Sequence, residues 1–284
     1  MHAYQQNSPE WLDMRRNKIG ASDAPVIMGV SPWKTPYQLW EEKLGFSGDR
    51  AQSRAMDRGH ALEETARMCF EKETGLIVVP QVVQHPDYEW MIASLDGIDF
   101  ASKNIVEIKC PGKVDHQCAL DGEVPSKYMP QMQHQLEVTG LNKGYYYSFD
   151  GQNGKVIEVY RDQNYIDSLL DREMAFWGCM VNLESPKLTD RDYIVKDDEL
   201  WSAAASSWLK IHRELEELKA KEEELRESLI CLSGKNNVKG AGVRLSKIIR
   251  KGAVDYKKIP EIRDVDLEAY RKSPIESWRI IANG

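Results

Sequence analysis

The sequence lacks several features that would assign a protein class at once. No run of 18 apolar residues occurs, so we expect no transmembrane helix and no membrane partner. The first residues carry no apolar segment of the kind found in a signal peptide. The five cysteines include no CxxC pair, which argues against a disulfide framework, a zinc ribbon or an iron–sulfur cluster. We therefore expect a soluble protein in a reducing, cytoplasmic compartment.

Positive charge is scarce as well, since the net charge is −7, and composition alone does not indicate nucleic-acid binding. The exception is residues 235–258, which contain eight lysines and arginines and one acidic residue. We expect a basic β-hairpin over residues 238–258, with Lys247, Arg250 and Lys251 as candidate DNA-binding residues. Three roles stay open for this part of the chain: a DNA grip, a docking arm for another protein or subunit, and a packed lid with solvated lysines.

A heptad pattern precedes the basic segment. Apolar residues repeat at intervals of three and four from Trp201 to Leu232, with Glu222 as the one polar intruder. The pattern predicts one helix over residues 199–232, whose apolar face needs a partner in the core, in another subunit or in the last segment. A short terminal helix should follow the hairpin. We therefore divide the chain into residues 1–190 and a C-terminal appendage over residues 191–284.

The period of the hydrophobic pattern changes along residues 1–190. Helical spacing predicts a helix from Met56 to Thr74. The segments "LIVVPQVVQH", "WMIASLDGIDF" and "NIVEIKC" are β-branched or alternating, which predicts a three-stranded antiparallel meander. The helix in "SKYMPQMQHQLEVTG", the strand pair "GYYYSFD" and "KVIEVYR", and the helix in "YIDSLLDREMAFWGCMVNL" follow. This order of elements predicts an α/β or α+β core.

The strand "IVEIK" carries an acid and a base. Glu107 and Lys109 share a face because alternate residues of a strand point the same way, and a short hairpin should place Asp96 beside Glu107. Neighbouring carboxylates repel each other unless a cation lies between them, and hard oxygen ligands suit Mg²⁺ or Mn²⁺. This arrangement predicts metal-assisted phosphodiester hydrolysis. The plainer alternative is a surface ion pair, with Asp96 a turn residue.

Acid, short turn, apolar E-x-K strand and helix follow the order found in the PD-(D/E)xK nucleases. Four segments extend the likeness: "WLDMRRNKIGASDAPVIMG", "DRGHALEETAR", "SLDG…EIKCPG" and "YMPQMQHQLEVTG". Together they resemble the lambda-type exonucleases, the YqaJ-like viral recombinase family, over residues 8 to about 180. The resemblance implies a restriction-endonuclease-like core, with a central mixed β-sheet flanked by helices.

The resemblance also implies a metal site. It places the ligands at Asp96, Glu107 and the backbone carbonyl of Ile108, with Glu63 holding the metal or its waters. It places the catalytic lysine at Lys109. One or two Mg²⁺ ions per site are implied, and Mn²⁺ is expected to substitute.

Neighbouring residues compete for two of the implied roles. The catalytic glutamine of the family falls on Gln131, with Gln135 one turn later as the runner-up, whereas Gln133 points elsewhere. The helix glutamate falls on Glu63, and its neighbour Glu64 does not keep the spacing.

A phosphate site is implied in "RRNKIGASD". The family's arginine and serine, seven residues apart, fall on Arg15 and Ser22, and Arg16 competes with Arg15. Ser22 could instead cap the helix that follows it, and the arginines could be plain surface charge. We expect Tyr128 to pack next to the site and His134 to be structural.

The implied activity is a Mg²⁺-dependent exonuclease that digests linear double-stranded DNA from its 5′ ends and leaves 3′ overhangs. The implied partners are duplex DNA ends, a phage single-strand annealing protein and further copies of the chain in a trimeric ring. The implied setting is homologous recombination by a phage or prophage in a bacterial cell. Two alternatives compete: an endonuclease of the same fold, and a non-catalytic DNA-binding or assembly protein.

Overall fold

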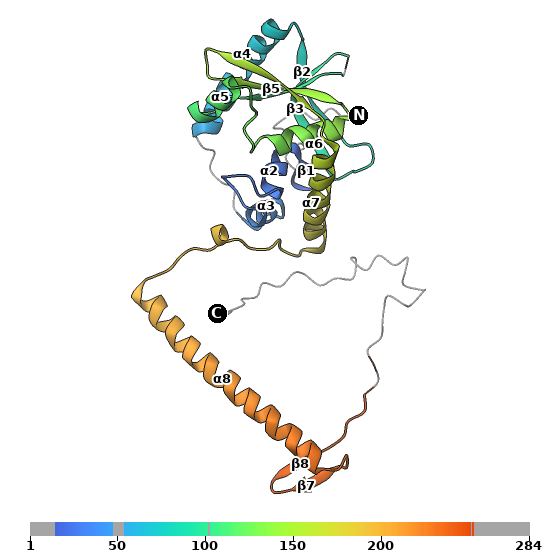
Figure 1. Ribbon diagram of the computed structural model, residues 1–284, viewed down its shortest axis with the longest axis vertical. Helices are drawn as coiled ribbons and strands as arrows, with labels where there is room; N and C mark the ends of the chain where they lie inside the picture. Colours follow the sequence, from blue (N-terminus) through green and yellow to red (C-terminus); the bar gives the residue numbers. More distant parts are fainter. Residues whose placement is uncertain (1–14, 48–53, 102, 251, 253–284) are drawn as a thin grey trace. The chain divides into compact units, whose positions relative to one another are not determined.

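The structure is a computed structural model that describes residues 15–47, 54–101, 103–250 and 252, with only the backbone described for residues 54–60. The chain divides into two compact units between Tyr193 and Ile194. The first unit holds the sheet and the helices around it, and the second holds a long helix and a hairpin (Figure 1). Each unit is described below by itself.

A mixed six-stranded sheet forms the centre of the first unit. Its strands are β1 (Ile19–Gly20), β2 (Val78–Gln84), β3 (Met91–Asp99), β4 (Ile105–Lys109), β5 (Lys143–Phe149) and β6 (Gly154–Tyr160). Strands β2, β3 and β4 form the predicted antiparallel meander. The parallel pairing of β4 with β5 makes the sheet mixed, which confirms the predicted fold class.

Helices cover both faces of the sheet (Figure 1). They are α2 (Ala24–Ile27), α3 (Pro36–Lys43), α4 (Arg54–Thr74), α5 (Lys113–Leu120), α6 (Met129–Thr139) and α7 (Gln163–Asn182), with 3-10 turns at Ala21–Asp23 and Asp190–Asp192. Met132 of α6 packs with Tyr146 of β5 in one core. Phe70 of α4 packs with Ile108 of β4 in another. Because Val106 and Ile108 face α4, Glu107 faces α6.

Strand β3 contains a β-bulge at the point where the two expected carboxylates meet. Asp96 and Gly97 together lie opposite one residue of β2, Pro80, because the register of the two strands shifts between Val79 and Gln81. A bulge bends the strand and redirects its side chains. Residues on both sides of the bulge therefore pack into the same core.

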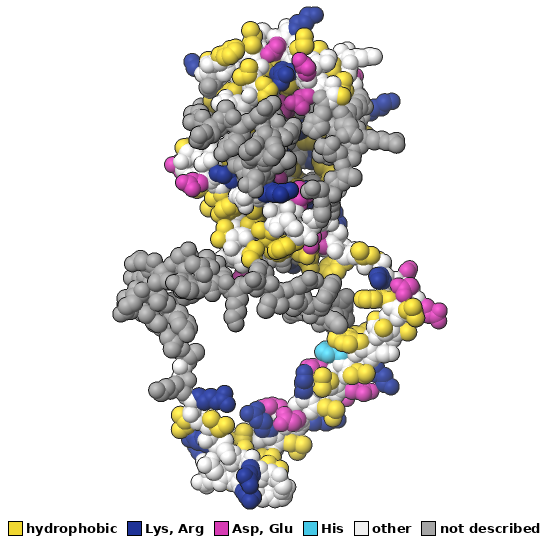
Figure 2. Space-filling view, turned by 180° about the vertical axis from the view of Figure 1, so that it is seen from behind, with side chains coloured by type: hydrophobic (Ala, Val, Ile, Leu, Met, Phe, Trp, Pro, Cys, Tyr) yellow, Lys and Arg dark blue, Asp and Glu magenta, His cyan; other side chains and the backbone are white. Residues whose placement is uncertain are grey.

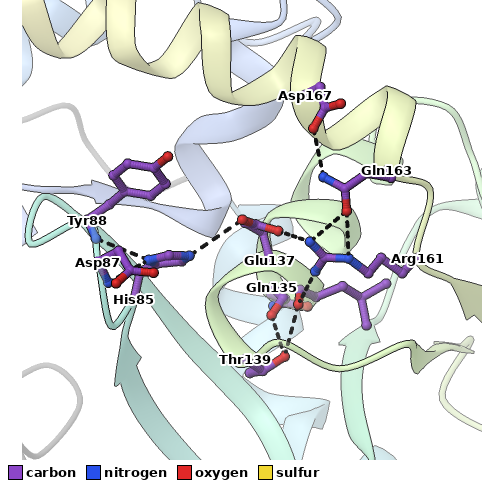
Figure 3. Close-up of polar contacts among 10 residues, drawn as sticks. His85, Asp87, Tyr88, Gln135, Glu137, Thr139, Arg161, Gln163 and Asp167 are labelled. Atoms are coloured by element: carbon purple, nitrogen blue, oxygen red, sulfur yellow. Dashed lines mark hydrogen bonds and ion pairs between the residues drawn. The ribbon is translucent and has the colours of Figure 1, made fainter.

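A polar network holds the C-terminal end of α6 (Figure 3). Glu137 forms an ion pair with Arg161, and its Oε1 lies 3.5 Å from Nε2 of His85. Arg161 also donates to the carbonyl of Leu136 at 3.0 Å. Nδ1 of His85 accepts the backbone N–H of Asp87 at 3.0 Å, so the ring proton lies on Nε2, facing Glu137. The network links α6 to the β2–β3 turn and to the start of α7.

The second unit begins with α8 (Glu199–Leu232), a single helix of 34 residues where the heptad pattern predicts one. Asp198 caps it by accepting the backbone N–H of Trp201 at 2.9 Å. Hydrophobic and charged side chains lie side by side along α8 (Figure 2). Several heptad residues are exposed in the described part of the chain: Trp201, Ile211, Leu215, Leu218, Leu225, Leu229 and Leu232. None of the described helices is long and apolar enough to cross a membrane.

The hairpin after α8 is shorter than the sequence predicts. It consists of β7 (Val238–Gly240) and β8 (Val243–Leu245), and residues 246–250 lie in no strand. The turn lies at Ala241 and Gly242, which both have positive φ. The expected hairpin over residues 238–258 is thus found over Val238–Leu245 and does not continue through residues 246–250; the rest of the expected hairpin lies outside the described residues except for Gly252. The expected terminal helix lies outside them.

We predict that Gly97→Ala destabilises the protein by about 1–3 kcal/mol. A Cβ at this position would lie 2.6 Å from Val78 Cγ2 and 2.8 Å from Val106 Cγ1, both in the packed core. Urea denaturation measures the loss. Gly178→Ala is the matched control, because nothing lies within 4 Å of a Cβ there and alanine favours a helix by up to about 1 kcal/mol over glycine. Equal stability of the two variants would contradict the tight approach at the bulge.

Candidate active site

Two carboxylates meet on the sheet, as the sequence predicts. Gly97 pairs with Val106, so the next residues along the two strands, Asp96 and Glu107, lie across from each other. Glu107 is 1% exposed. Asp96 Oδ2 accepts the backbone N–H of Ile108 at 2.8 Å, which fixes its carboxylate against β4. The hairpin thus holds two acidic groups together, with Glu107 buried and Asp96 half-buried.

The local electrostatics reflect this crowding. Burial and the charge of Glu107 raise the pKa of Asp96 well above its usual value, and the charge of Glu63 adds to the effect. Lys109 Nζ lies 2.5 Å from Glu107 Oε1. Burial alone would lower the pKa of Lys109, but the two carboxylates outweigh it and raise that pKa. Lys109 is therefore a fixed cation beside an acidic pair.

Two glutamines of α6 bind the same carboxylate. Gln131 Nε2 donates to Glu107 Oε1 at 2.6 Å, and Gln135 Nε2 donates to Glu107 Oε2 at 2.5 Å. They are four residues apart and so share one helix face. Gln133 instead bonds the carbonyl of Tyr160 at 2.9 Å, as the sequence predicts. The structure thus brings both candidate glutamines to the site.

The residues present fit a divalent cation. Asp96 and Glu107 supply hard oxygen donors beside a main-chain carbonyl, and their mutual repulsion is the kind that a cation relieves. Gln135 Oε1 is buried and has no hydrogen-bond partner within the described residues, so it can accept a hydrogen bond from a water molecule at this place. Glu63 lies close enough to raise the pKa of Asp96. Across the described residues, however, no three His, Cys, Asp or Glu side chains form a ready cluster.

Arg15 and Ser22 lie together, seven residues apart in the chain. Arg15 Nη2 donates to Ser22 Oγ, and Ser22 is exposed. The alternative role of Ser22 as a helix cap is wrong: Ser22 lies inside the 3-10 turn Ala21–Asp23, and Asp23 occupies the N-cap position of α2. The hydroxyl and the guanidinium together form a small polar surface that suits an anion.

A buried ion pair holds the segment that carries Arg15 and Ser22, which we call the Arg15–Ser22 corner. Asp23 Oδ2 lies 2.6 Å from Lys43 Nζ and accepts the backbone N–H of Gly20 at 2.9 Å. Lys43 also donates to the carbonyls of Arg15 at 2.8 Å and Lys18 at 2.7 Å. Burial opposes the ionisation of Asp23, but Lys43 and Arg15 outweigh it and lower its pKa. Sequence analysis missed this pair, because the lysine is on α3 and no local pattern links it to Asp23.

Two further candidate residues, His134 and Tyr128, lie where the sequence predicts. His134 is fully buried, 2.7 Å from Glu173 and 2.9 Å from the carbonyl of Ile92, a structural position as expected. Tyr128 packs next to the site, stacked on Tyr146.

The basic residues belong to the second unit. Lys247 and Arg250 follow its hairpin, and Lys251 lies outside the described residues. Their expected role in DNA binding stays a prediction.

We predict that Lys43→Met costs about 3–5 kcal/mol of stability, because it leaves Asp23 buried without its cation. Adding Asp23→Asn should recover part of the loss, and a double-mutant cycle in urea measures the coupling. Lys34→Met is the matched control, since its ion pair with Glu42 is partly exposed and should contribute less than about 1 kcal/mol. Equal losses for Lys43→Met and Lys34→Met would contradict the buried pair.

Comparison with known proteins agrees with the resemblance seen in the sequence. Residues 10–142 match the family described as the YqaJ-like viral recombinase domain. The uncharacterized protein YqaJ of Bacillus subtilis is 35% identical over 175 residues, which cover 60% of this chain and 55% of that protein. The uncharacterized protein R354 of Acanthamoeba polyphaga mimivirus is 26% identical over 49% of this chain and 28% of its own length. The chain thus spans about half or less of the curated relatives it matches.

A solved structure shares the fold. The alkaline exonuclease LHK-Exo from Laribacter hongkongensis is 26% identical, and the match covers 62% of this chain and 94% of that one with a TM-score of 0.54. The crystal structure of LHK-Exo in complex with dAMP matches over the same shares with a TM-score of 0.55. These likenesses confirm a phage-exonuclease type of restriction-endonuclease-like fold. Residues 10–142 are thus similar to the YqaJ-like viral recombinase domain.

Proposed function

We propose that the protein is a Mg²⁺-dependent exonuclease that digests linear double-stranded DNA from 5′ ends and leaves 3′ single-stranded overhangs. One observation carries the proposal: the half-buried Asp96 lies across from the buried Glu107, and Lys109 Nζ lies 2.5 Å from Glu107 Oε1. Two carboxylates and a fixed ammonium suit a reaction that passes through a highly charged phosphorane-like transition state. The likeness to an alkaline exonuclease supports the same reaction class.

The chain's own residues have separable tasks in this reaction. A divalent cation bound by Asp96, Glu107 and the carbonyl of Ile108 would supply the Lewis-acid chemistry of phosphodiester hydrolysis, with Mn²⁺ as a substitute for Mg²⁺. Lys109 places a positive charge beside the scissile phosphate. Gln135, through its unpartnered Oε1, is placed to orient the attacking water.

Two further residues support the carboxylates. Gln131 fixes the Glu107 carboxylate through its Nε2. Glu63 adds negative charge from α4 on the metal side.

The preference for 5′ ends follows from the Arg15–Ser22 corner. A terminal 5′-phosphate carries more charge than an internal phosphodiester, and a guanidinium with a hydroxyl can bind its oxygens. The complex of LHK-Exo with dAMP shows that this relative binds a nucleotide, which supports a nucleotide-binding role for the present domain.

The biological setting is part of the proposal. The resulting 3′ strand would pass to a phage single-strand annealing protein for recombination in the cytoplasm of a bacterial host. Further copies of the chain in a trimeric ring would keep the enzyme on its DNA. The cations of the second unit, Lys247, Arg250 and Lys251, would contribute phosphate contacts.

We predict that Glu107→Gln and Lys109→Met each lower the rate of digestion of linear duplex DNA by at least about a hundredfold. The first loses a metal ligand, so it should also weaken Mn²⁺ binding in calorimetry, whereas the second should leave most of that binding. Lys103→Met, at an exposed lysine of the β3–β4 turn, is the matched control and should digest at the parent rate. Digestion at the parent rate by both site variants would disprove this site.

We predict that Ser22→Ala and Arg15→Ala reduce the preference for 5′-phosphate over 5′-hydroxyl ends by about tenfold, since a charge-assisted hydrogen bond contributes roughly 1.5–3 kcal/mol. The measurement is the ratio of initial rates on end-labelled duplexes that differ only in the terminal phosphate. Arg16→Ala is the control that separates the two neighbouring arginines. If only Arg16→Ala changed the ratio, the phosphate contact would belong to Arg16.

A further inference from the structure

An exposed tryptophan lies near the candidate active site. Trp33 lies in the loop between α2 and α3 and is 62% exposed. Lys127 Nζ lies 4.9 Å from the centre of its ring and 5.3 Å from the ring of Tyr128. Lys127 also forms an ion pair with Asp115 at 2.7 Å, which holds the ammonium group in place between the two rings.

Tyr128 also connects this tryptophan with the candidate catalytic lysine, Lys109. Lys109 Nζ lies 5.5 Å from the ring of Tyr128. Tyr128 also stacks on the buried ring of Tyr146 at 5.9 Å, and Tyr146 is the β5 partner of Glu107. Trp33 is therefore separated from Lys109 by only Tyr128 and Lys127. A nucleic-acid strand that is bound at Lys109 needs only a few nucleotides to reach Trp33.

The loop that carries Trp33 is fixed. Arg191 donates to the carbonyl of Ser31 at 3.0 Å and to that of Pro32 at 2.9 Å. Thr35 caps α3 and donates to Asp192. An exposed aromatic ring on a loop that is tied at both ends loses little conformational entropy when it binds a ligand.

We propose that Trp33 and Lys127 form a nucleotide-binding platform, in which the exposed ring stacks on a base of the strand at the active site and the ammonium group contacts a phosphate of that strand. An aromatic face beside a cation is the combination that binds single-stranded nucleic acid without sequence preference. The platform would hold the end of the strand after it separates from its complement. The inference rests on the proposed nuclease function, because it names a further contact for the same substrate.

Binding to DNA tests the platform without relying on hydrolysis. The full chain with Glu107→Gln is titrated with a duplex that has a short 5′ single-stranded end, and anisotropy gives the Kd. In this background Trp33→Ala should weaken binding by about tenfold, the lower part of the range for loss of one stacked base. Trp33→Phe should retain most of the affinity. Lys127→Ala should lower the salt dependence by about one phosphate contact.

The chain contains a matched control. Trp201 is 55% exposed, and Lys196 Nζ lies 5.6 Å from its ring, so Trp201→Ala removes a similar aromatic surface from the second unit. It should leave the Kd unchanged. Circular dichroism checks that each variant is folded.

Photocrosslinking gives an independent readout. DNA with 5-iododeoxyuridine at each of the first three 5′ positions is irradiated with the Glu107→Gln protein, and mass spectrometry locates the crosslink. A crosslink at Trp33 supports the platform. Equal affinity of the Trp33→Ala and parent proteins, or crosslinks only elsewhere, overturns it while the nuclease proposal stands. Failure of the parent chain to bind any DNA overturns both.

Discussion

The close approach of two carboxylates, the half-buried Asp96 and the buried Glu107, is the interaction on which the rest of the first unit depends. A folded chain gains nothing in stability from placing like charges together out of water, so other groups must offset the cost. Lys109 supplies an opposite charge, and Gln131 and Gln135 supply hydrogen bonds. The bulge in β3 and the packing of α6 against the sheet make this arrangement possible. The site is thus a strained part of the core that a divalent cation would relax.

A second buried charge pair, Asp23 with Lys43, has a different role. Its charges are opposite and its remaining hydrogen bonds go to the backbone, including the carbonyls of Arg15 and Lys18. A lysine on α3 therefore fixes the segment that carries Arg15 and Ser22. The two arrangements divide the work of the domain: one concentrates negative charge where a cation can bind, and the other holds positive charge where an anion can bind.

The second unit differs from the first in that its long helix leaves apolar side chains exposed. In the part that the structure describes, α8 carries many exposed apolar side chains, and the residues that match the family model, 10–142, all precede it. The likeness to known proteins therefore bears on the first unit, and the helix and hairpin are interpreted from their own sequence pattern. A heptad helix of 34 residues is far longer than most helices of globular proteins, and its apolar positions are typical of a helix that pairs with another surface.

The sequence by itself determined the elements whose signal is local. Alternation predicted the meander and the shared face of Glu107 and Lys109, and heptad spacing predicted α8, because side-chain direction within one element depends only on its period. Glycines at the ends of α4 and α6, Gly75 and Gly140, have the positive φ that ends a helix.

Only the tertiary structure decided the rest. It brought both Gln131 and Gln135 to Glu107, placed Lys43 under the arginine of the phosphate corner, and put Trp33 beside Lys127. These contacts join residues far apart in the chain, and the packing of whole elements decides which of them meet. The shift of register in β3 and the short hairpin at β7–β8 belong to the same class, because pairing between strands fixes them and no single strand encodes them.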